Sequence, residues 1–343
     1  MKIAIVAHSV FPLGQPYKGG LENFIHVLAT RLADAGIDTT LYCHTDTPEG
    51  SYHKVAFTDF NYNFDNCFDS LNRDYSSLLK ELSSSSSSFD LIHNNSLNKD
   101  ILKLSALKIP LLTTIHVPPI PHFKEAVYEN FLNKNCFYNI VSHACLKSWT
   151  ALSNCKVIHN GIDSSTWKIG RKEKKEKRAI WFGRICREKG VERAILASKR
   201  AGFHLVIAGI INDYDYYDYL ERNYNSDFSY VGLCNHTKLN SLIKESQVFV
   251  NAPLWEEPFG LVYLESLASG TPIATYSSNI SKELLNSSVA AITDNNIDAL
   301  AEGITKASTL DSLTCRKYVE EKFNIETMVH NYIQYYREIL CIS

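Results

Sequence analysis

No apolar stretch in this chain of 343 residues is long enough to cross a membrane, and the apolar run at residues 3–7 is too short for a signal-peptide core. The nine cysteines include no C-x-x-C pair, and their number is odd, which favours reduced thiols over a disulfide framework. Positive charge is not in surplus, because the net charge is −2, and this excludes a general nucleic-acid binder. We therefore expect a cytoplasmic protein without a nucleic-acid partner. Peripheral contact with the inner face of a membrane stays open.

What is present is an ordinary globular composition, with 45% hydrophobic and 21% charged residues, over a length that suits two domains. Short apolar runs alternate with helical patterns in two rounds. In the first round we expect strands at residues 3–7, 39–43, 91–92, 111–115, 139–141 and 156–158. In the second round we expect them at residues 179–182, 205–208, 229–231, 248–251 and 273–275. This alternation predicts α/β domains with parallel sheets.

A charged run separates the two rounds. Residues 171–178 hold six basic and two acidic side chains, and a solvated hinge is a simpler interpretation than contact with anionic lipid. We place a first domain at 1–165 and a second at 166–324, and we expect a last helix at about 325–343 to pack back on the first domain. The serine run Ser83–Ser88 is interpreted as a flexible surface linker.

The most informative motif places two carboxylates eight positions apart, at Glu257 and Glu265. Pro258 and Gly260 mark a loop between them, so a helix should begin within residues 259–261. The first amides of such a helix have no internal partner and can bind an anion. Glu257 would then lie at the entrance of an anion site and Glu265 about two turns inside the helix. Taken alone, the motif fits a surface helix with two solvated glutamates equally well.

Two further candidates follow predicted strands of the first domain, where ligands of open α/β sheets bind. Gly19 and Gly20 lead into the first helix and permit close approach of a ligand to the backbone. This loop lacks G-x-G-x-x-G, which disfavours a dinucleotide-binding enzyme, and a simple helix-start turn is the alternative. His116 closes the strand at 111–115 and can hydrogen-bond a sugar hydroxyl, although a lone histidine is more often structural.

The loop after the strand at 179–182 supplies cations. Arg184 and Lys189 suit a diphosphate, since a planar guanidinium and an ammonium are both phosphate-binding groups. Their alternative is a pair of surface cations beside a helix start, an interpretation that fits Arg187 and Glu188 better.

Together these motifs resemble the retaining family 4 glycosyltransferases of GT-B fold (glycosyl transferases group 1). The matching pieces are Gly19-Gly20-Leu21-Glu22, Thr114-Ile115-His116, His159-Asn160-Gly161-Ile162-Asp163, Gly183-Arg184 with Lys189-Gly190, and Glu257-Pro258-Phe259-Gly260-Leu261 through Glu265. The resemblance implies an α/β protein of two Rossmann-like domains whose parallel sheets face a central cleft. It implies an enzyme that moves a sugar from a nucleoside diphosphate sugar, a co-substrate, to a hydroxyl acceptor. It also implies no metal and no separate cofactor.

The resemblance also implies roles for single residues. The catalytic residues would be His116, Arg184, Lys189 and Glu257. The donor-binding residues would be Gly19, Gly20, Val231, Phe259, Gly260, Leu261 and Glu265. Glu257 would hold the transferred sugar and Glu265 the ribose. The loop around Val231 would flank the base, but its sequence does not distinguish uridine from guanosine or adenosine. We prefer a UDP-sugar to a GDP- or ADP-sugar.

Some features leave alternatives open. The loop Ser277-Ser278-Asn279 replaces glycines that relatives often carry, and residues 118–138 look abbreviated. The acceptor therefore stays open among a glycan, a lipid-linked saccharide and a small metabolite. A non-catalytic sugar-nucleotide binding protein and a GT-B-fold sugar-nucleotide epimerase are the alternative functions. The tyrosine-dense stretch at 214–219 is interpreted as a packed helix face rather than an interaction surface.

Overall fold

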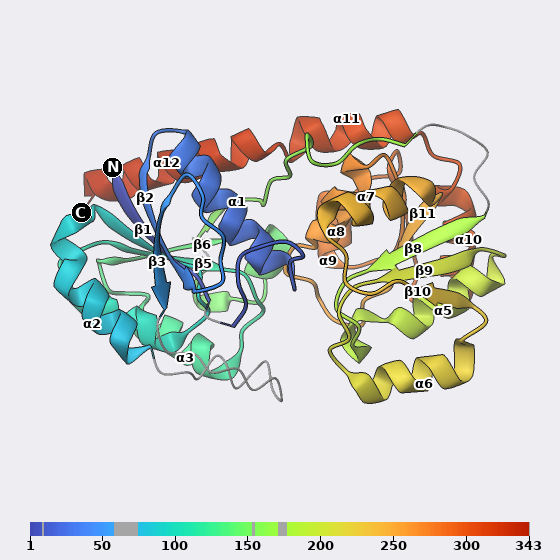
Figure 1. The fold of residues 1–343 in the computed structure, drawn as a ribbon, viewed down its shortest axis with the longest axis horizontal. Coiled ribbons are helices and arrows are strands. Elements are labelled where there is room, and N and C mark those ends of the chain that lie inside the picture. The colour runs from blue at the N-terminus through green and yellow to red at the C-terminus, as the bar shows by residue number, and fades with distance from the viewer. Residues whose placement is uncertain (9, 58–74, 153–154, 171–176, 343) are drawn as a thin grey trace. The chain divides into compact units, whose positions relative to one another are not determined.

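The computed structural model describes residues 1–8, 10–57, 75–152, 155–170 and 177–342 (Figure 1). The chain divides into two compact units. The first unit comprises Met1–Tyr17, Leu21–His159 and Glu326–Ser343, and the second comprises Lys18–Gly20 and Asn160–Ile325. The first unit is therefore discontinuous in sequence, because its last segment follows the whole of the second unit.

The first unit is built on a parallel sheet. Its strands are β1 (Lys2–Val6), β2 (Asp38–His44), β3 (His53–Phe57), β4 (Leu91–Asn94), β5 (Leu111–Ile115), β6 (Cys136–Ile140) and β7 (Lys156–Val157). Seven strands of the described residues lie in the order β3-β2-β1-β4-β5-β6-β7, and every neighbouring pair is parallel. The predicted parallel α/β sheet is confirmed, and β3 is a strand that the sequence did not predict.

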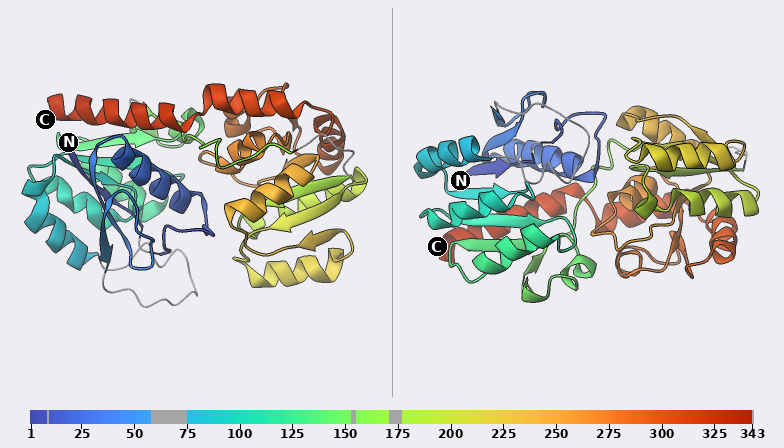
Figure 2. Two further views of the ribbon diagram at one scale, coloured as in Figure 1. Left: turned by 45° about the horizontal axis from the view of Figure 1, so that its top comes forward. Right: turned by 90° about the horizontal axis from the view of Figure 1, so that it is seen from below.

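Helices cover both faces of this sheet (Figure 2). They are α1 (Gly20–Asp34), α2 (Ser76–Ser85), α3 (Pro121–Asn130), α4 (His143–Leu146) and α12 (Ile325–Ile342), with 3-10 turns η2 (Ser86–Ser88), η3 (Lys99–Ala106) and η4 (Thr150–Leu152). Neighbouring residues of a strand point to opposite faces. On β4, Ile92 joins the apolar cluster under α2, η3 and α3, whereas His93 contacts Tyr332 and Tyr336 of α12.

The serine run and the charged run differ from their predictions. Ser83–Ser85 end α2 and the next three serines form η2, so the run is helical rather than a flexible linker. The helix is held because Leu78 and Leu82, one turn apart, are buried. Residues 171–176 of the predicted hinge lie outside the described residues. Arg178, which follows them, begins β8 and pairs with Glu245 at 3.0 Å.

The second unit repeats the architecture. Its strands are β8 (Arg178–Phe182), β9 (His204–Ala208), β10 (Phe228–Tyr230), β11 (Val248–Asn251), β12 (Ile273–Tyr276) and β13 (Ala290–Thr293). Its helices are η5 (Arg187–Lys189), α5 (Val191–Arg200), α6 (Tyr214–Tyr224), α7 (His236–Glu245), α8 (Leu261–Ala268), α9 (Asn279–Leu284), α10 (Ile297–Ala307) and α11 (Ser312–Lys322). The strands of its described residues lie in the order β10-β9-β8-β11-β12-β13, all parallel.

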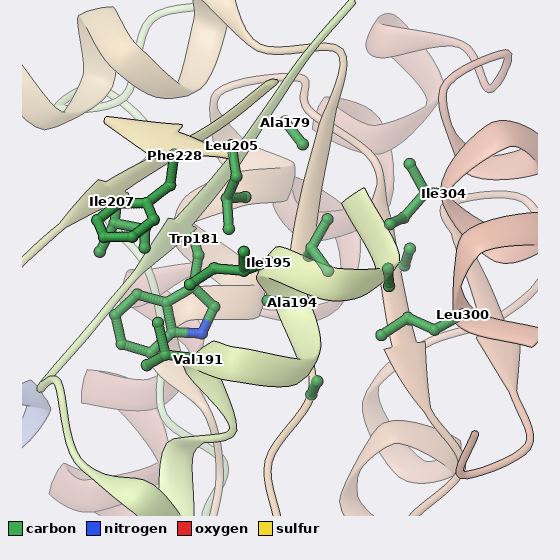
Figure 3. Close-up of a cluster of buried hydrophobic side chains, with 14 of the residues drawn as sticks. Ala179, Trp181, Val191, Ala194, Ile195, Leu205, Ile207, Phe228, Leu300 and Ile304 are labelled. Atoms are coloured by element: carbon green, nitrogen blue, oxygen red, sulfur yellow. The ribbon is translucent and has the colours of Figure 1, made fainter. Parts of the chain in front are cut away.

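One apolar core of the second unit lies between its sheet and helices α5, α6 and α10 (Figure 3). Trp181 of β8 packs there with Val191 and Ile195 of α5, and Leu300 of α10 joins the same cluster (Figure 3). Tyr216 and Tyr217 of α6 are also buried in it, whereas Tyr214 and Tyr219 are exposed, so the packing interpretation of the tyrosine-dense stretch holds for two of its four tyrosines. This core fixes the sheet whose carboxyl edge carries most of the predicted site.

Within the described ranges, no helix combines the length and the apolar character needed to cross a membrane. The cysteines of these ranges are all free, and Cys341 is the exposed one among them.

Candidate functional site

Two loops meet at the carboxyl edge of the second sheet because β8 and β11 are neighbours in it. The loop after β8 holds Gly190 in the left-handed region, with φ of +67°. A Cβ at Gly190 would lie 1.8 Å from the carbonyl oxygen of Ala252, in the loop after β11. The amide of Leu254 also donates to the carbonyl of Glu188 at 2.8 Å. The loops therefore pack backbone against backbone, and only glycine fits at the contact.

This contact brings Lys189 to Glu257. The Nζ of Lys189 lies 2.5 Å from Oε1 of Glu257, and their side chains are only 17% and 9% exposed. The indole Nε1 of Trp255 donates to the same Oε1 at 2.9 Å, and the Lys189 ammonium lies 4.7 Å from the centre of a Trp255 ring. The structure thus unites two predicted residues with one that the sequence analysis missed. An aromatic side chain two positions before Glu257 was the available signal.

Arg184 is a second cation of this edge. It is half-buried, and its guanidinium forms no hydrogen bond or ion pair within the described residues, although its charge acts on the nearby carboxyl of Glu188. Arg187, three positions on, differs: it lies 3.7 Å from Asp213 and stacks over Tyr216 at 4.9 Å. Arg187 is therefore a structural cation, whereas Arg184 can receive an anion.

Helix α8 begins at Leu261, within the predicted range. Gly260 precedes it in the left-handed region, with φ of +84°, and no side chain caps the helix. The first amides of α8 are therefore without a capping side chain, and the helix dipole adds a partial positive charge there. Phe259 is buried against Phe323, with ring centres 6.4 Å apart, so it can serve a ligand only through its backbone.

Glu265 lies one turn inside α8, as its fifth residue, rather than the two turns predicted. It is 8% exposed, and its carboxylate has no hydrogen bond or ion pair within the described part of the chain. Burial raises the pKa of Glu265 to about 7. A buried carboxyl without partners is costly when charged, and ligand hydroxyls that donate to it would lower that cost.

Val231 follows β10, at the same edge of the sheet. Its carbonyl accepts a hydrogen bond from Lys238 Nζ at 3.2 Å, and its amide donates to the carbonyl of Ile207 at 3.0 Å. The next residue, Gly232, accepts from the amide of Gly209 at 2.9 Å. The loops after β9 and β10 are thereby tied together beside the loop that carries Arg184.

His116 lies in the first unit, directly after β5. Its Nε2 is 2.9 Å from Oδ1 of Asn95, and the ring of Phe24 lies 4.7 Å from its own. Burial lowers the pKa of His116 to about 3, and the nearby His8 adds to the shift. Asn95, which follows β4, was not predicted, and its only signal was a position after a buried strand.

The two glycines of the first loop lie where α1 begins, and Gly19 and Gly20 both avoid the left-handed region. Nearby, His8 follows β1, and its Nε2 lies 3.1 Å from Oε1 of Glu22 in the first turn of α1. Both side chains are buried. This pair was also missed, although Glu22 belongs to the motif that led to the resemblance.

A metal site does not form among the described residues, where no three His, Cys, Asp or Glu side chains gather closely enough to hold an ion.

Comparison with known proteins identifies the family. Residues 165–323 match the family described as glycosyl transferases group 1, and residues 18–166 match Glycosyltransferase Family 4. The chain belongs to these glycosyltransferases. It is 36% identical over 133 residues to a glycogen synthase of Mycobacterium tuberculosis, covering 36% of this chain and 32% of that one. It is 31% identical over 186 residues to a glycosyltransferase of Methanocaldococcus jannaschii, covering 48% and 47%. The match thus spans about a third to a half of these relatives.

Solved structures share the fold over the whole chain. Sucrose-phosphate synthase of Thermosynechococcus elongatus has a TM-score of 0.80 at 18% identity, covering 100% of both chains. Anabaena HepE in complex with UDP-glucose has a TM-score of 0.77 at 17% identity, covering 98% of this chain and 100% of that one. The fold is the GT-B fold, with two Rossmann-like domains on parallel sheets.

Proposed function

We propose that the protein transfers a sugar from a nucleoside diphosphate sugar to a hydroxyl group of an acceptor, with retention of configuration at the anomeric carbon. The observation that carries this proposal is the composition of one sheet edge. It combines a Lys189–Glu257 ion pair with Arg184 and the buried Glu265 of α8, neither of which forms a side-chain hydrogen bond or ion pair among the described residues. Cations for a diphosphate and carboxylates for hydroxyl groups are what such a donor needs.

The leaving group of this reaction is a nucleoside diphosphate, on which negative charge grows as the bond to the sugar breaks. Arg184 and Lys189 would stabilise that charge, assisted by the amides at the start of α8. Glu257 would exchange Lys189 for hydroxyls of the donor sugar, Glu265 would accept from the ribose, and His116 would contact the sugar. The acceptor oxygen would attack the face from which the diphosphate departs and pass its proton to the departing phosphate oxygen. We propose that neither a metal nor another cofactor takes part.

We propose a UDP-sugar as the donor, with the Val231 loop beside the base. The support comes from Anabaena HepE, which shares the fold and was solved with UDP-glucose. The acceptor class stays a choice among a saccharide, a lipid-linked saccharide and a small metabolite. We also propose a cytoplasmic location, with membrane-surface contact as a variant of it.

The test is sugar transfer by Arg184→Ala, Lys189→Ala and Glu257→Ala variants, with UDP-glucose and a panel of acceptors. We expect each variant to lose about a hundredfold or more in kcat, since each removes a charged group that acts on the transition state. Arg187→Ala is the matched control, because it removes the same charge from the same loop while leaving Arg184 in place. Wild-type turnover in all three site variants would refute the site assignment.

Product analysis separates the remaining alternatives. NMR of the product linkage should show the anomeric configuration of the donor, and an inverted linkage would refute retention. Conversion of the donor to an isomeric sugar nucleotide without any acceptor would indicate an epimerase. Binding of UDP-glucose without turnover of any acceptor would indicate a sugar-nucleotide binding protein.

A further inference from the structure

His116 has one occupied ring nitrogen and one free one. Nε2 lies 2.9 Å from Asn95 Oδ1, whereas Nδ1 has no hydrogen-bond partner within the described residues. The protonation of Nδ1 therefore decides whether His116 offers a ligand a donor or an acceptor.

The orientation of the Asn95 amide decides which nitrogen carries the proton. Asn95 is fully buried, and its Nδ2 points to the main-chain carbonyl of His93 at 3.5 Å. A carbonyl can only accept, so the amino end of Asn95 faces His93 and its oxygen faces His116. That oxygen can only accept as well, and Nε2 of His116 must therefore carry a hydrogen.

A neutral imidazole has a single N–H group, so the same geometry leaves Nδ1 with a lone pair. His116 stays neutral over the physiological range, because burial lowers its pKa to about 3. The opposite tautomer would place the lone pair of Nε2 against that of the Asn95 oxygen.

We propose that Asn95 is a positioning residue that holds His116 in the Nε2–H tautomer, so that His116 presents a hydrogen-bond acceptor to the donor sugar. The sugar selected in this way has a free hydroxyl at the contact. A uronate carboxylate or a keto group can only accept and is disfavoured there. The choice of sugar rests on the proposed function, whereas the tautomer does not.

The tautomer is measured without any substrate. In protein labelled with 15N-histidine, long-range 1H–15N NMR distinguishes a protonated from an unprotonated ring nitrogen, and a His116→Gln variant assigns the signals. We expect protonated Nε2 and unprotonated Nδ1 in the wild-type protein. A protonated Nδ1, or an even mixture of both tautomers, would overturn the proposal.

Two variants test the role of Asn95. In Asn95→Ala we expect exchange between the tautomers, and in Asn95→Asp we expect retained Nε2–H with a higher pKa of His116, because a carboxylate stabilises the imidazolium. Asn94→Ala is the matched control: Asn94 is also buried on β4, but its Oδ1 accepts from the amide of Ser96 at 3.0 Å. His116 signals that are the same in folded Asn95→Ala and in Asn94→Ala would contradict the assignment.

The kinetic arm uses a panel of nucleoside diphosphate sugars that includes UDP-glucose. We expect Asn95→Ala to lose about tenfold in kcat/KM for the donor that the wild type uses, the size of one hydrogen bond. Asn95→Asp should lose activity towards acid pH at a higher pH than the wild type, since an imidazolium cannot accept. Wild-type kcat/KM in Asn95→Ala would overturn the contact with the sugar. If the wild type turns over no donor of the panel, the proposed function fails and the NMR result still decides the tautomer.

Discussion

The ion pair between Lys189 and Glu257 determines what a donor must do when it binds. The Nζ of Lys189 and the Oε1 of Glu257 lie 2.5 Å apart. These are also the atoms with which the two side chains would bind a ligand, so the ion pair competes with the ligand for them. A diphosphate that takes Lys189 leaves Glu257 with the Nε1 of Trp255 as its hydrogen-bond partner among the described residues. Trp255 is thus the contact that can keep the carboxylate in place while the lysine moves.

We expect Trp255→Phe to lower kcat/KM about tenfold, because it removes one hydrogen bond to a carboxylate and keeps an aromatic ring beside Lys189. Steady-state kinetics with UDP-glucose measures this effect. Trp255→Leu, which also removes the ring, is the comparison. If Trp255→Phe behaves like the wild type and Trp255→Leu does not, the ring matters and the N–H does not.

Glu265→Gln should raise the stability of the ligand-free protein above pH 7. Burial raises the pKa of Glu265 from 4.5 to about 7, so the folded state holds a proton that the unfolded state releases. The cost of the charge in the folded state builds up between pH 4.5 and 7 and amounts to about 3 kcal/mol at most.

Urea unfolding of the wild type and Glu265→Gln at pH 8 and at pH 4.5 measures this difference. The gain should be present at pH 8 and absent at pH 4.5. An equal difference at both values would mean that the carboxyl is not desolvated. The same variant should bind UDP more weakly if Glu265 holds the ribose.

At the scale of elements, the contact between the loops after β8 and β11 places the site. We expect Gly190→Ala to lower the free energy of unfolding by more than about 3 kcal/mol, from a left-handed φ and a backbone clash together. Gly202→Ala is the matched control, because Gly202 has φ of +73° and a Cβ added there would meet no heavy atom within 4 Å. That variant should cost only about 1 kcal/mol.

Chemical denaturation measures both glycine variants, and UDP binding measures the displacement of Lys189. Equal losses of stability in the two would show that the loops separate without cost. Unchanged UDP affinity in Gly190→Ala would show that the loop contact does not position the lysine.

Helix α12 is attached to the first sheet by a directed chain of buried hydrogen bonds. Asn139 Nδ2 donates to Tyr332 at 3.0 Å, and Thr114 donates to Asn139 Oδ1 at 2.7 Å. The Thr114 oxygen therefore accepts from His93 Nε2, at 2.7 Å, and His93 Nδ1 accepts from the hydroxyl of Tyr336 at 2.7 Å. Every member has a defined direction, so each loss leaves a buried group unsatisfied.

We expect Tyr336→Phe to destabilise the first unit by about 1–3 kcal/mol, because His93 Nδ1 then lacks a donor in a buried place. Tyr335→Phe is the control, since the hydroxyl of Tyr335 donates to a main-chain carbonyl, of Tyr138, from a half-buried position. Urea unfolding compares the two. A larger loss in Tyr335→Phe would contradict the directed chain.

The sequence predicted most strands and missed β3 and β13. Strand β3 has the sequence His-Lys-Val-Ala-Phe and begins with two polar residues, and β13 has the sequence Ala-Ala-Ile-Thr. Alanine is depleted in strands, so both patterns are weak. Their position at a sheet edge is not the reason, because the edge strands β7 and β10 were predicted. Within the site, Arg184, Lys189 and Glu257 could be proposed from the sequence, because their charges and their positions after predicted strands suit a phosphate and hydroxyl groups.

The contacts of the site were not readable. That Lys189 meets Glu257, and that Asn95 meets His116, depends on which strands are neighbours, since each pair joins loops after adjacent strands. Sequence periodicity gives the strands but not their order in a sheet. Asn95 was missed for this reason, whereas Trp255 lies in the same loop as Glu257 and was missed despite the signal of its aromatic side chain.

For the whole molecule, acidification should affect the two units in opposite directions. Burial lowers the pKa values of His93 and His116 in the first unit to about 3. Below pH 6.5 these histidines are therefore protonated in the unfolded state but stay neutral in the folded state. The first unit should lose about 2 kcal/mol per histidine at pH 5. Glu265 of the second unit acts the other way, because its raised pKa favours the folded state as the pH falls from 7 to 4.5.

Hydrogen exchange with peptide resolution at pH 7.5 and pH 5, corrected for the intrinsic exchange rate, tests this contrast. Peptides of β4 and β5 should lose protection at pH 5, and peptides of α8 should not. A parallel loss in both units would show that His93, His116 and Glu265 do not control the response.

The late position of α12 in the chain has a consequence for biosynthesis. The face of the first sheet that carries His93, Thr114 and Asn139 is covered by residues translated after the entire second unit. During translation the polar and apolar groups of this face stay uncovered until α12 is synthesised. By then all strands of the second unit have been synthesised. The first unit therefore completes its fold last, after the second unit has been translated.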